Sequence, residues 1–241
     1  ADGDARAALT LLEIAAALTD DDGGAITAET VVAAIGDGRR RFDKGGDAFY
    51  DQLSALQKSI RGSDPDAALY WLARLLDGGA DPRVAARRIL VTASEDIGNA
   101  DPRALTLALD AWQAYERLGS PEGELALAQA VTFLACAAKS NAVHAGWKQA
   151  REDVRRQGSL PVPDALRSAA TALNRAQGAG RGYRYAHDEP DGFAAGMNYL
   201  PQEIAGRTYY HPVSRGLELK IGEKLERLRE LNRRAARKPK S

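Results

Sequence analysis

Four pairs of a helix-capping residue followed by proline constrain the fold more than any other feature of the sequence. The pairs are Asp64-Pro65, Asp81-Pro82, Asp101-Pro102 and Ser120-Pro121, and they start 17, 20 and 19 residues apart. Proline is tolerated at the first helical position because the N–H that it lacks would have no intrahelical partner there. The preceding Asp or Ser side chain accepts from the free amides of the first turn. The spacing therefore predicts four successive helices joined by short turns.

The segments between these pairs have the periodicity of helices. The stretch "ELALAQAVTFLACAA" (124–138) is apolar on nearly all sides, which predicts a helix at the centre of the core. Similar patterns predict further helices over 4–18, 28–35, 47–60, 141–157, 164–177 and 213–236. The stretch 178–212 is rich in Gly and Pro, which predicts an ordered loop or a disordered segment, with "GYRYAH" and "RTYYHP" as candidates for short extended pieces. Its length favours a loop that packs on a surface through its tyrosines. The fold class predicted is all-α.

Charge is unevenly distributed along a chain whose formal net charge is zero. Residues 1–34 hold one basic and seven acidic side chains, whereas residues 215–241 hold ten basic and four acidic ones. This asymmetry indicates an acidic face and a basic tail. The tail has three open interpretations: it follows DNA phosphates, it binds an acidic peptide, or it keeps the end of the chain soluble. Cys136 is the only cysteine, which excludes an internal disulfide and favours a reducing compartment.

Motifs for self-contained catalysis or metal binding are missing from the sequence. Lys139-Ser140 has the last two residues of a phosphate-binding loop, but Phe133 stands where its first glycine belongs, so a polar helix connection is the better interpretation. "GAGRG" (178–182) is interpreted as a loop rather than a phosphate site, and Asp188-Glu189 as a surface turn rather than an acidic metal motif. His144, His187 and His211 lack the spacing of a zinc site, so no metal site is expected. The tryptophans Trp71, Trp112 and Trp147 lie on apolar faces and are predicted to be core residues.

The first residues, "GDARAALTLLE", resemble the sensor 2 segment of AAA+ ATPases of the clamp-loader and Holliday-junction-helicase kind. That segment typically reads G-D-x-R-x-x-L-N, and it opens a helix of the lid subdomain. Gly3, Asp4, Arg6 and Leu9 match the pattern, while Thr10 stands where asparagine is usual.

Longer segments extend the resemblance over essentially the whole chain. They include "YDQLSALQKSIRGSDPDAALYWLARLL" (50–76), "ASEDIGNADPRAL" (93–105), "GSPEGELALAQAV" (119–131), "KSNAV" (139–143), "PVPDALR" (161–167), "GYRYAHD" (182–188) and "YLPQEIAGRTYYHP" (199–212). In this order they resemble the C-terminal half of the replication-associated recombination protein A family, whose eukaryotic relative is the Werner helicase-interacting protein. Ala138 departs from the family, which usually has proline in "APKSN".

The resemblance implies a function and an architecture. Family members are DNA-dependent AAA+ ATPases that act at stalled or damaged replication forks, in the bacterial cytosol, and interact with single-stranded DNA-binding protein. Residues 1–76 would be the lid with connecting helices, and residues 77–241 a helical domain that resembles the clamp-loader collar and forms a homotetramer. ATP and Mg would bind the parent protein, whose P-loop, acidic motif and arginine finger would lie upstream of this chain. No catalytic residue is therefore expected within it, and no membrane contact.

Arg6 is the one nucleotide-binding residue that the resemblance implies. The first turn of its helix would face the phosphates, where free amides and a planar guanidinium both favour anionic oxygens. A different class of function stays open: a free-standing helical module that recruits a replication partner. The apolar helices over 102–118 and 121–137 are candidates for the core and for a subunit interface.

Overall fold

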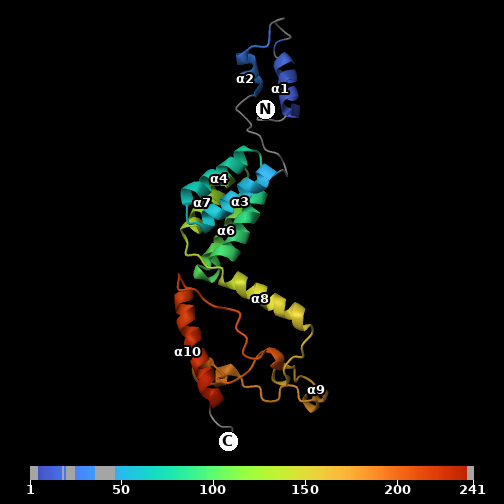
Figure 1. Ribbon diagram of the computed structural model, residues 1–241, viewed down its shortest axis with the longest axis vertical. Helices are drawn as coiled ribbons and strands as arrows, with labels where there is room; N and C mark the ends of the chain where they lie inside the picture. The colour runs from blue at the N-terminus through green and yellow to red at the C-terminus, as the bar shows by residue number, and fades with distance from the viewer. Residues whose placement is uncertain (1–4, 18, 20–24, 36–46, 238–241) are drawn as a thin grey trace. The chain divides into compact units, whose positions relative to one another are not determined.

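The computed structural model describes residues 5–17, 19, 25–35 and 47–237, and this part of the chain contains helices and no strands (Figure 1). The predicted all-α class is confirmed. The α-helices are α1 (Ala5–Ala17), α2 (Ala28–Ile35), α3 (Asp47–Arg61), α4 (Pro65–Asp77), α5 (Pro82–Thr92), α6 (Arg103–Leu118), α7 (Glu122–Cys136), α8 (Ala142–Gln157), α9 (Ala172–Ala176) and α10 (Glu218–Arg237). Within the described ranges, no helix has both the length and the apolar character that crossing a membrane requires.

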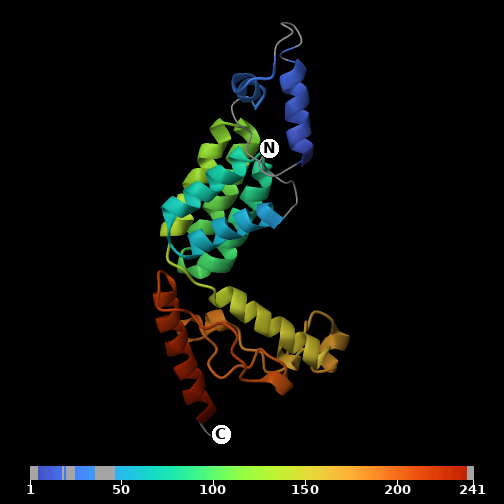
Figure 2. The same cartoon turned by 45° about the horizontal axis from the view of Figure 1, so that its top comes forward.

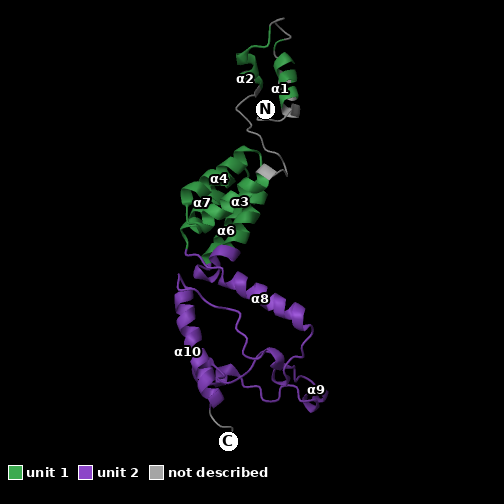
Figure 3. Ribbon diagram, in the orientation of Figure 1, with its two compact units in different colours: residues 1–93, 103–137 green, residues 94–102, 138–241 purple. Residues whose placement is uncertain are grey.

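The chain divides into two compact units, which Figure 3 colours separately. Unit 1 comprises residues 1–93 and 103–137, and unit 2 comprises residues 94–102 and 138–241. In unit 1, α3 to α7 pack into a helical bundle in which α6 lies against α7 and α3 against α4. The helices α1 and α2 pack against each other.

The core of the bundle follows the predicted periodicity. Its largest fully buried side chains are Leu56 and Ile60 of α3, Leu75 of α4, Ile89 of α5, and Leu127, Val131 and Leu134 of α7. α7 is therefore the central helix, as its apolar sequence predicts. The helices α6 and α7 approach closely because α7 carries Gly123, where a Cβ atom would lie 2.8 Å from the Cα of Tyr115.

Two of the four predicted helix starts are confirmed in detail. Asp64 accepts from the Ala67 amide at 2.9 Å ahead of α4, and Asp81 accepts from the Arg83 amide at 2.9 Å ahead of α5. The cap predicted for Ser120 is wrong, because α7 begins at Glu122 without a side-chain cap. The first amides of that helix donate instead to the backbone carbonyls of Gly119 and Pro121. The Ser120–Pro121 peptide is cis.

Unit 2 contains two long helices, α8 and α10, and a long connection between them that includes short helical turns (Figure 2). The helix predicted over 164–177 is wrong for most of its length, since only a 3-10 turn at Asp164–Leu166 and the short α9 form there. Thr171 caps α9 by accepting from the Asn174 amide, and side chains of α9 hold the preceding carbonyls of Ser168, Ala169 and Ala170.

The last helix begins five residues later than predicted, at Glu218 rather than 213. Gly216 adopts a left-handed φ of 53°, which ends any helix that starts before it. A Cβ atom at this glycine would lie 2.1 Å from the Ala100 carbonyl oxygen, which accepts from the Leu217 amide. The chain therefore approaches residue 100 closely before α10 starts.

Candidate functional site

Arg6 lies in the first turn of α1, as the sequence predicts. That turn contains no acidic residue. The side chain of Arg6 is outside the part of the molecule that the structure describes, as are Gly3 and Asp4. The role of Arg6 as a nucleotide sensor therefore stays a prediction.

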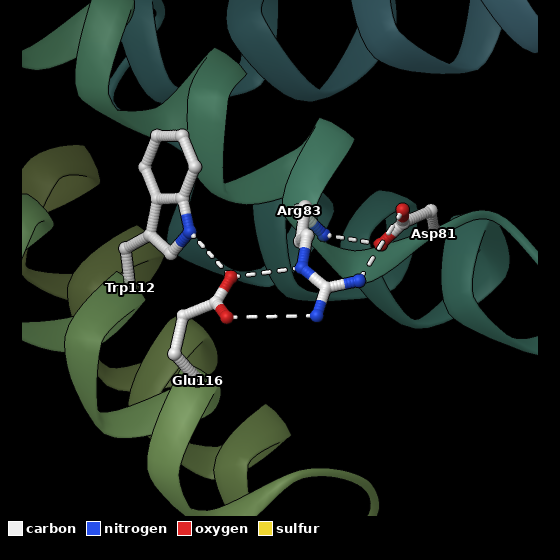
Figure 4. A network of polar contacts seen from close by, with 4 residues as sticks. All are labelled: Asp81, Arg83, Trp112 and Glu116. Atoms are coloured by element: carbon white, nitrogen blue, oxygen red, sulfur yellow. Dashed lines mark hydrogen bonds and ion pairs between the residues drawn. The ribbon is translucent and has the colours of Figure 1, made fainter.

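A network of polar side chains connects α5 and α6, and Figure 4 shows it. Arg83 of α5 donates from Nε to Glu116 Oε1 at 2.8 Å and from Nη2 to Oε2 at 3.5 Å. Trp112 donates from its indole nitrogen to the same Oε1 at 3.1 Å. Asp81 lies on the other side of the guanidinium, 3.8 Å from Nη1. The network links the start of α5 to the end of α6.

The electrostatics of this network favour both charged forms. Two hydrogen bonds lower the pKa of the Glu116 carboxyl below its ordinary value: the bond from Arg83 has the larger effect and the bond from Trp112 the smaller one. The pKa of Arg83 is raised by its hydrogen bond to Glu116 and by the negative charge of that carboxylate. The Arg83 and Glu116 side chains are solvent-exposed, so their ion pair contributes little to stability, and its main effect is to hold the half-buried Trp112 ring in place on α6.

Apolar side chains extend along α6 on the same face as Trp112. The buried residues Ala104, Ala108 and Ala111 lie on a neighbouring face, about 100° around the helix axis, while Leu105 and Leu109 are 48% and 44% exposed. On α7, Leu127 is fully buried but Leu125 is 75% exposed. The segments 102–118 and 121–137 thus contribute to the core, as predicted, and also leave large apolar side chains on the surface.

Glu218, the first residue of α10, is a fully buried carboxylate held by three donors. Its Oε2 accepts from the Ser140 hydroxyl and the Val213 amide, each at 2.8 Å, and its Oε1 accepts from the Tyr210 hydroxyl at 2.9 Å. Asn99 donates to that tyrosine at 3.3 Å. A buried carboxylate is tolerated only when donors replace the water that it has lost. Sequence periodicity missed this residue because Glu218 lies in a segment that looks like a solvated charged helix.

Ser140 also explains the "KSN" segment. Its hydroxyl accepts from the Ala142 amide at 3.1 Å in the first turn of α8, and its own amide donates to the Asp96 carbonyl at 2.8 Å. The interpretation of Lys139-Ser140 as a polar helix connection is confirmed, because the segment joins α7 to α8 and the Ser140 hydroxyl accepts from the first amide of α8.

Asp153 forms a second polar cluster on α8. It accepts from the Tyr209 hydroxyl at 2.9 Å and forms ion pairs with Arg156 and Arg207. Desolvation, followed by the hydrogen bond to Asp153, raises the pKa of Tyr209. The cluster lines an open cavity of about 210 Å³. Both arginines already bind Asp153, so the cluster anchors the 207–209 segment to α8. The predicted packing of the loop through tyrosines is confirmed for Tyr209 and Tyr210, whereas Tyr183, Tyr185 and Tyr199 are exposed.

The prediction that all three tryptophans are core residues is wrong for Trp147. Trp71 and Trp112 are half-buried, but the Trp147 side chain on α8 is 64% exposed. The three histidines do not converge: His144 is exposed on α8, His187 lies beside Tyr185, and His211 contacts the Thr208 carbonyl. In the described ranges, no group of three or more His, Cys, Asp and Glu side chains is arranged to hold a metal ion.

Two family models together match residues 1–229 of the chain. Residues 62–229 match the family model described as "MgsA AAA+ ATPase C terminal", and residues 1–61 match the one described as "AAA C-terminal domain". The chain belongs to the MgsA AAA+ ATPase C-terminal family. Helices α4 to α9 and the first part of α10 fall within the MgsA match, whereas α1 to α3 fall within the other match.

Relatives of this MgsA-family chain are longer proteins. The replication-associated recombination protein A of Coxiella burnetii is 60% identical over 234 residues, which is 96% of this chain and 53% of that protein. The protein of the same name from Escherichia coli K12 is 52% identical over 95% of this chain and 52% of its own length. ATPase WRNIP1 of Dictyostelium discoideum is 43% identical over 70% of this chain and 19% of its own length. The chain spans about half the length of the bacterial relatives that it matches. The predicted resemblance is confirmed.

Proposed function

We propose that this chain is the lid and oligomerisation portion of a DNA-dependent AAA+ ATPase that acts at stalled or damaged replication forks. The observation that carries the proposal is the match to the MgsA AAA+ ATPase C-terminal family together with relatives named for replication-associated recombination. In this proposal residues 1–76 form the lid with its connecting helices, and residues 77–241 form the oligomerisation domain. The other half of the longer protein supplies the P-loop, the Mg ligands and the arginine finger.

Arg6 senses the nucleotide in this proposal. Its place in the first turn of α1 supports the role, because free amides and the helix dipole favour an anion at that end. A guanidinium forms bidentate, charge-assisted hydrogen bonds with phosphate oxygens. Loss of the γ-phosphate removes charge beside Arg6, which would change the angle of the lid. ATP and Mg bind the longer protein, and this chain alone does not hydrolyse ATP.

The test is ATP turnover by this chain joined to its upstream ATPase core. The substitution Arg6→Ala should lower turnover about ten- to a hundred-fold, since a hydrogen bond to a charged group contributes ~1.5–3 kcal/mol. Arg87→Ala removes an exposed arginine of α5 and serves as the matched control, with turnover unchanged. Unchanged turnover in Arg6→Ala would show that Arg6 is not a nucleotide sensor.

Self-assembly into a homotetramer is the second part of the proposal. It is supported by the exposed leucines of α6 and α7, since closed symmetric assemblies commonly cover such faces. Light scattering at micromolar concentration should give about four times the 25.8 kDa chain mass. Leu109→Glu, on the exposed face, should lower that mass while the chain stays folded. Leu127→Glu places a charge in the core and should unfold the chain, whereas Glu226→Gln on exposed α10 should change neither property. A wild-type mass near 25.8 kDa contradicts this part.

The partners proposed are single-stranded DNA-binding protein and fork DNA, in the cytoplasm of a bacterium. A helical module that only recruits a replication partner is the alternative. That module would be monomeric, and an upstream segment without a P-loop would favour it over the ATPase.

A further inference from the structure

Helix α8 has an apolar ridge on its outer face. Trp147 is 64% exposed, and Val143 and Val154 on the same face are exposed as well. The buried residues Ala142, Gly146 and Asp153 lie on a different face, about 100° around the helix axis from the ridge. Figure 2 shows α8 beside the connection that packs in unit 2. An indole with this much exposure is unusual, because tryptophan is highly buried on average in folded proteins.

Cationic side chains line one edge of this ridge. Lys148, Arg151 and Arg155 are exposed, and the structure gives none of them a carboxylate partner within the described residues. At 100° per residue, they and the ridge share an arc of roughly 140° on the helix. The two acidic residues of α8, Glu152 and Asp153, fall outside that arc.

Three cations of α10 are paired with carboxylates. Arg227 pairs with Asp191, and Arg233 and Arg234 both pair with Glu230. Lys148, Arg151 and Arg155 of α8 have no such partner within the described residues, and they lie beside an exposed indole.

We propose that this outer face of α8 binds single-stranded nucleic acid, with a base stacked on Trp147 and the phosphates along Lys148, Arg151 and Arg155. Single-strand binding surfaces combine a positive track for the backbone with aromatic rings on which bases stack. A duplex does not expose a base face for the indole, so single strands bind more tightly than duplexes of the same length. The choice of DNA as the ligand rests on the proposed function. The test of this binding surface, however, needs no ATP.

The experiment measures binding of the chain to a fluorescein-labelled 20-nucleotide oligothymidylate by fluorescence anisotropy. Trp147→Ala should weaken binding about 5- to 150-fold, the range measured when a stacking aromatic is truncated. Trp147→Phe should retain most of the affinity, and Trp147→Gln is a second non-aromatic variant in case the alanine variant misfolds. Tyr70→Ala removes another exposed aromatic, on α4 in unit 1, and should leave the affinity unchanged.

The salt dependence of binding tests the three cationic side chains separately. Replacing Lys148, Arg151 and Arg155 with alanine should reduce the slope of log affinity against log salt by about 2, since each single-strand phosphate contact contributes about 0.7. Replacing the paired Arg233 and Arg234 is the control and should change the slope much less.

Three results would overturn the proposal. The first is a wild-type chain that does not bind the oligonucleotide at about 50 mM salt, where phosphate contacts are strong. The second is equal affinity in wild type and Trp147→Ala, and the third is a Trp147→Ala variant that loses self-assembly, which would make the face a contact between copies. Failure of the ATPase proposal has a different signature, because it would appear as absent turnover in the longer protein with oligonucleotide binding intact.

Discussion

The hydroxyl of Ser140 donates a hydrogen bond to the buried carboxylate of Glu218 across 2.8 Å, although 78 residues of sequence separate the two. Ser140 precedes α8 and Glu218 begins α10, so this contact fixes the starts of the two long helices of unit 2 beside each other. Tyr210 and Val213 complete the set of donors. A single acidic side chain therefore organises the segment that leads into the last helix.

Removing the Glu218 carboxylate should destabilise unit 2. In Glu218→Ala, three buried or half-buried donors lose their acceptor, and each unsatisfied group costs about 1–3 kcal/mol. Glu218→Gln keeps one carbonyl acceptor and should cost less. Denaturant unfolding followed by circular dichroism measures the difference, and hydrogen exchange at the Val213 amide localises it. Glu226→Gln, on the exposed side of α10, is the control, and equal stability of Glu218→Ala and wild type would show that the carboxylate is not an anchor.

Replacing two helical glycines with alanine should change the free energy of unfolding in opposite directions. At Gly146 of α8 a Cβ atom would lie 2.7 Å from the Tyr209 carbonyl oxygen, so Gly146→Ala must push α8 away from the 209–210 segment. At Gly222 of α10 the nearest atom is the Pro212 Cβ at 3.8 Å, an ordinary contact. Alanine favours an open helical position by about 0.5–1 kcal/mol over glycine.

The measurement is the free energy of unfolding of the two single variants. Gly222→Ala should be more stable than wild type, and Gly146→Ala less stable, because the close backbone approach outweighs the gain in helix propensity. A stabilised Gly146→Ala would mean that α8 does not depend on that approach.

The helices were predictable from the sequence where local chemistry alone determines them. Asp64 and Asp81 cap α4 and α5 as predicted, and the all-round apolar α7 is central. The prediction failed where contacts from distant residues decide. The helix over 164–177 is interrupted because side chains of α9 bind the carbonyls of Ser168 to Ala170, which a periodic pattern does not reveal.

The candidate sites show the same limit. The helical spacing of Trp147 from apolar residues predicts a core position, yet α8 is buried through small and polar residues on a different face. Glu218 has the sequence context of a solvated charge, and only the long-range donors Ser140 and Tyr210 make it a buried anchor. The role of Arg6 is predicted by the family resemblance, and the turnover of Arg6→Ala tests it.

The pKa of Glu116 should depend on Arg83. The hydrogen bond from Arg83 is the largest cause of the lowered carboxyl pKa, and the bond from Trp112 is the next. Arg83→Ala should therefore raise the pKa of Glu116 toward its ordinary value, and Trp112→Phe should raise it by less. Carbon-detected NMR of the Glu116 carboxyl as a function of pH measures both changes. Arg87→Ala, which removes another exposed arginine of α5, should leave the titration where it is in wild type.

The Arg83–Glu116 pair also predicts the direction in which stability changes with pH. Because the pKa of Glu116 is lower in the folded chain than in the unfolded one, the ionised carboxylate stabilises the fold. That contribution is fully present above the unfolded pKa, about 4.3 for glutamate, and it is lost as the pH falls through the lower pKa of the folded state. The difference in unfolding free energy between wild type and Arg83→Ala should therefore be constant near neutral pH and shrink in acid. The group is exposed, so the difference will be small, and added salt should reduce it. A difference that grows as the pH falls would contradict the assignment of Arg83 as the partner that lowers the pKa of Glu116.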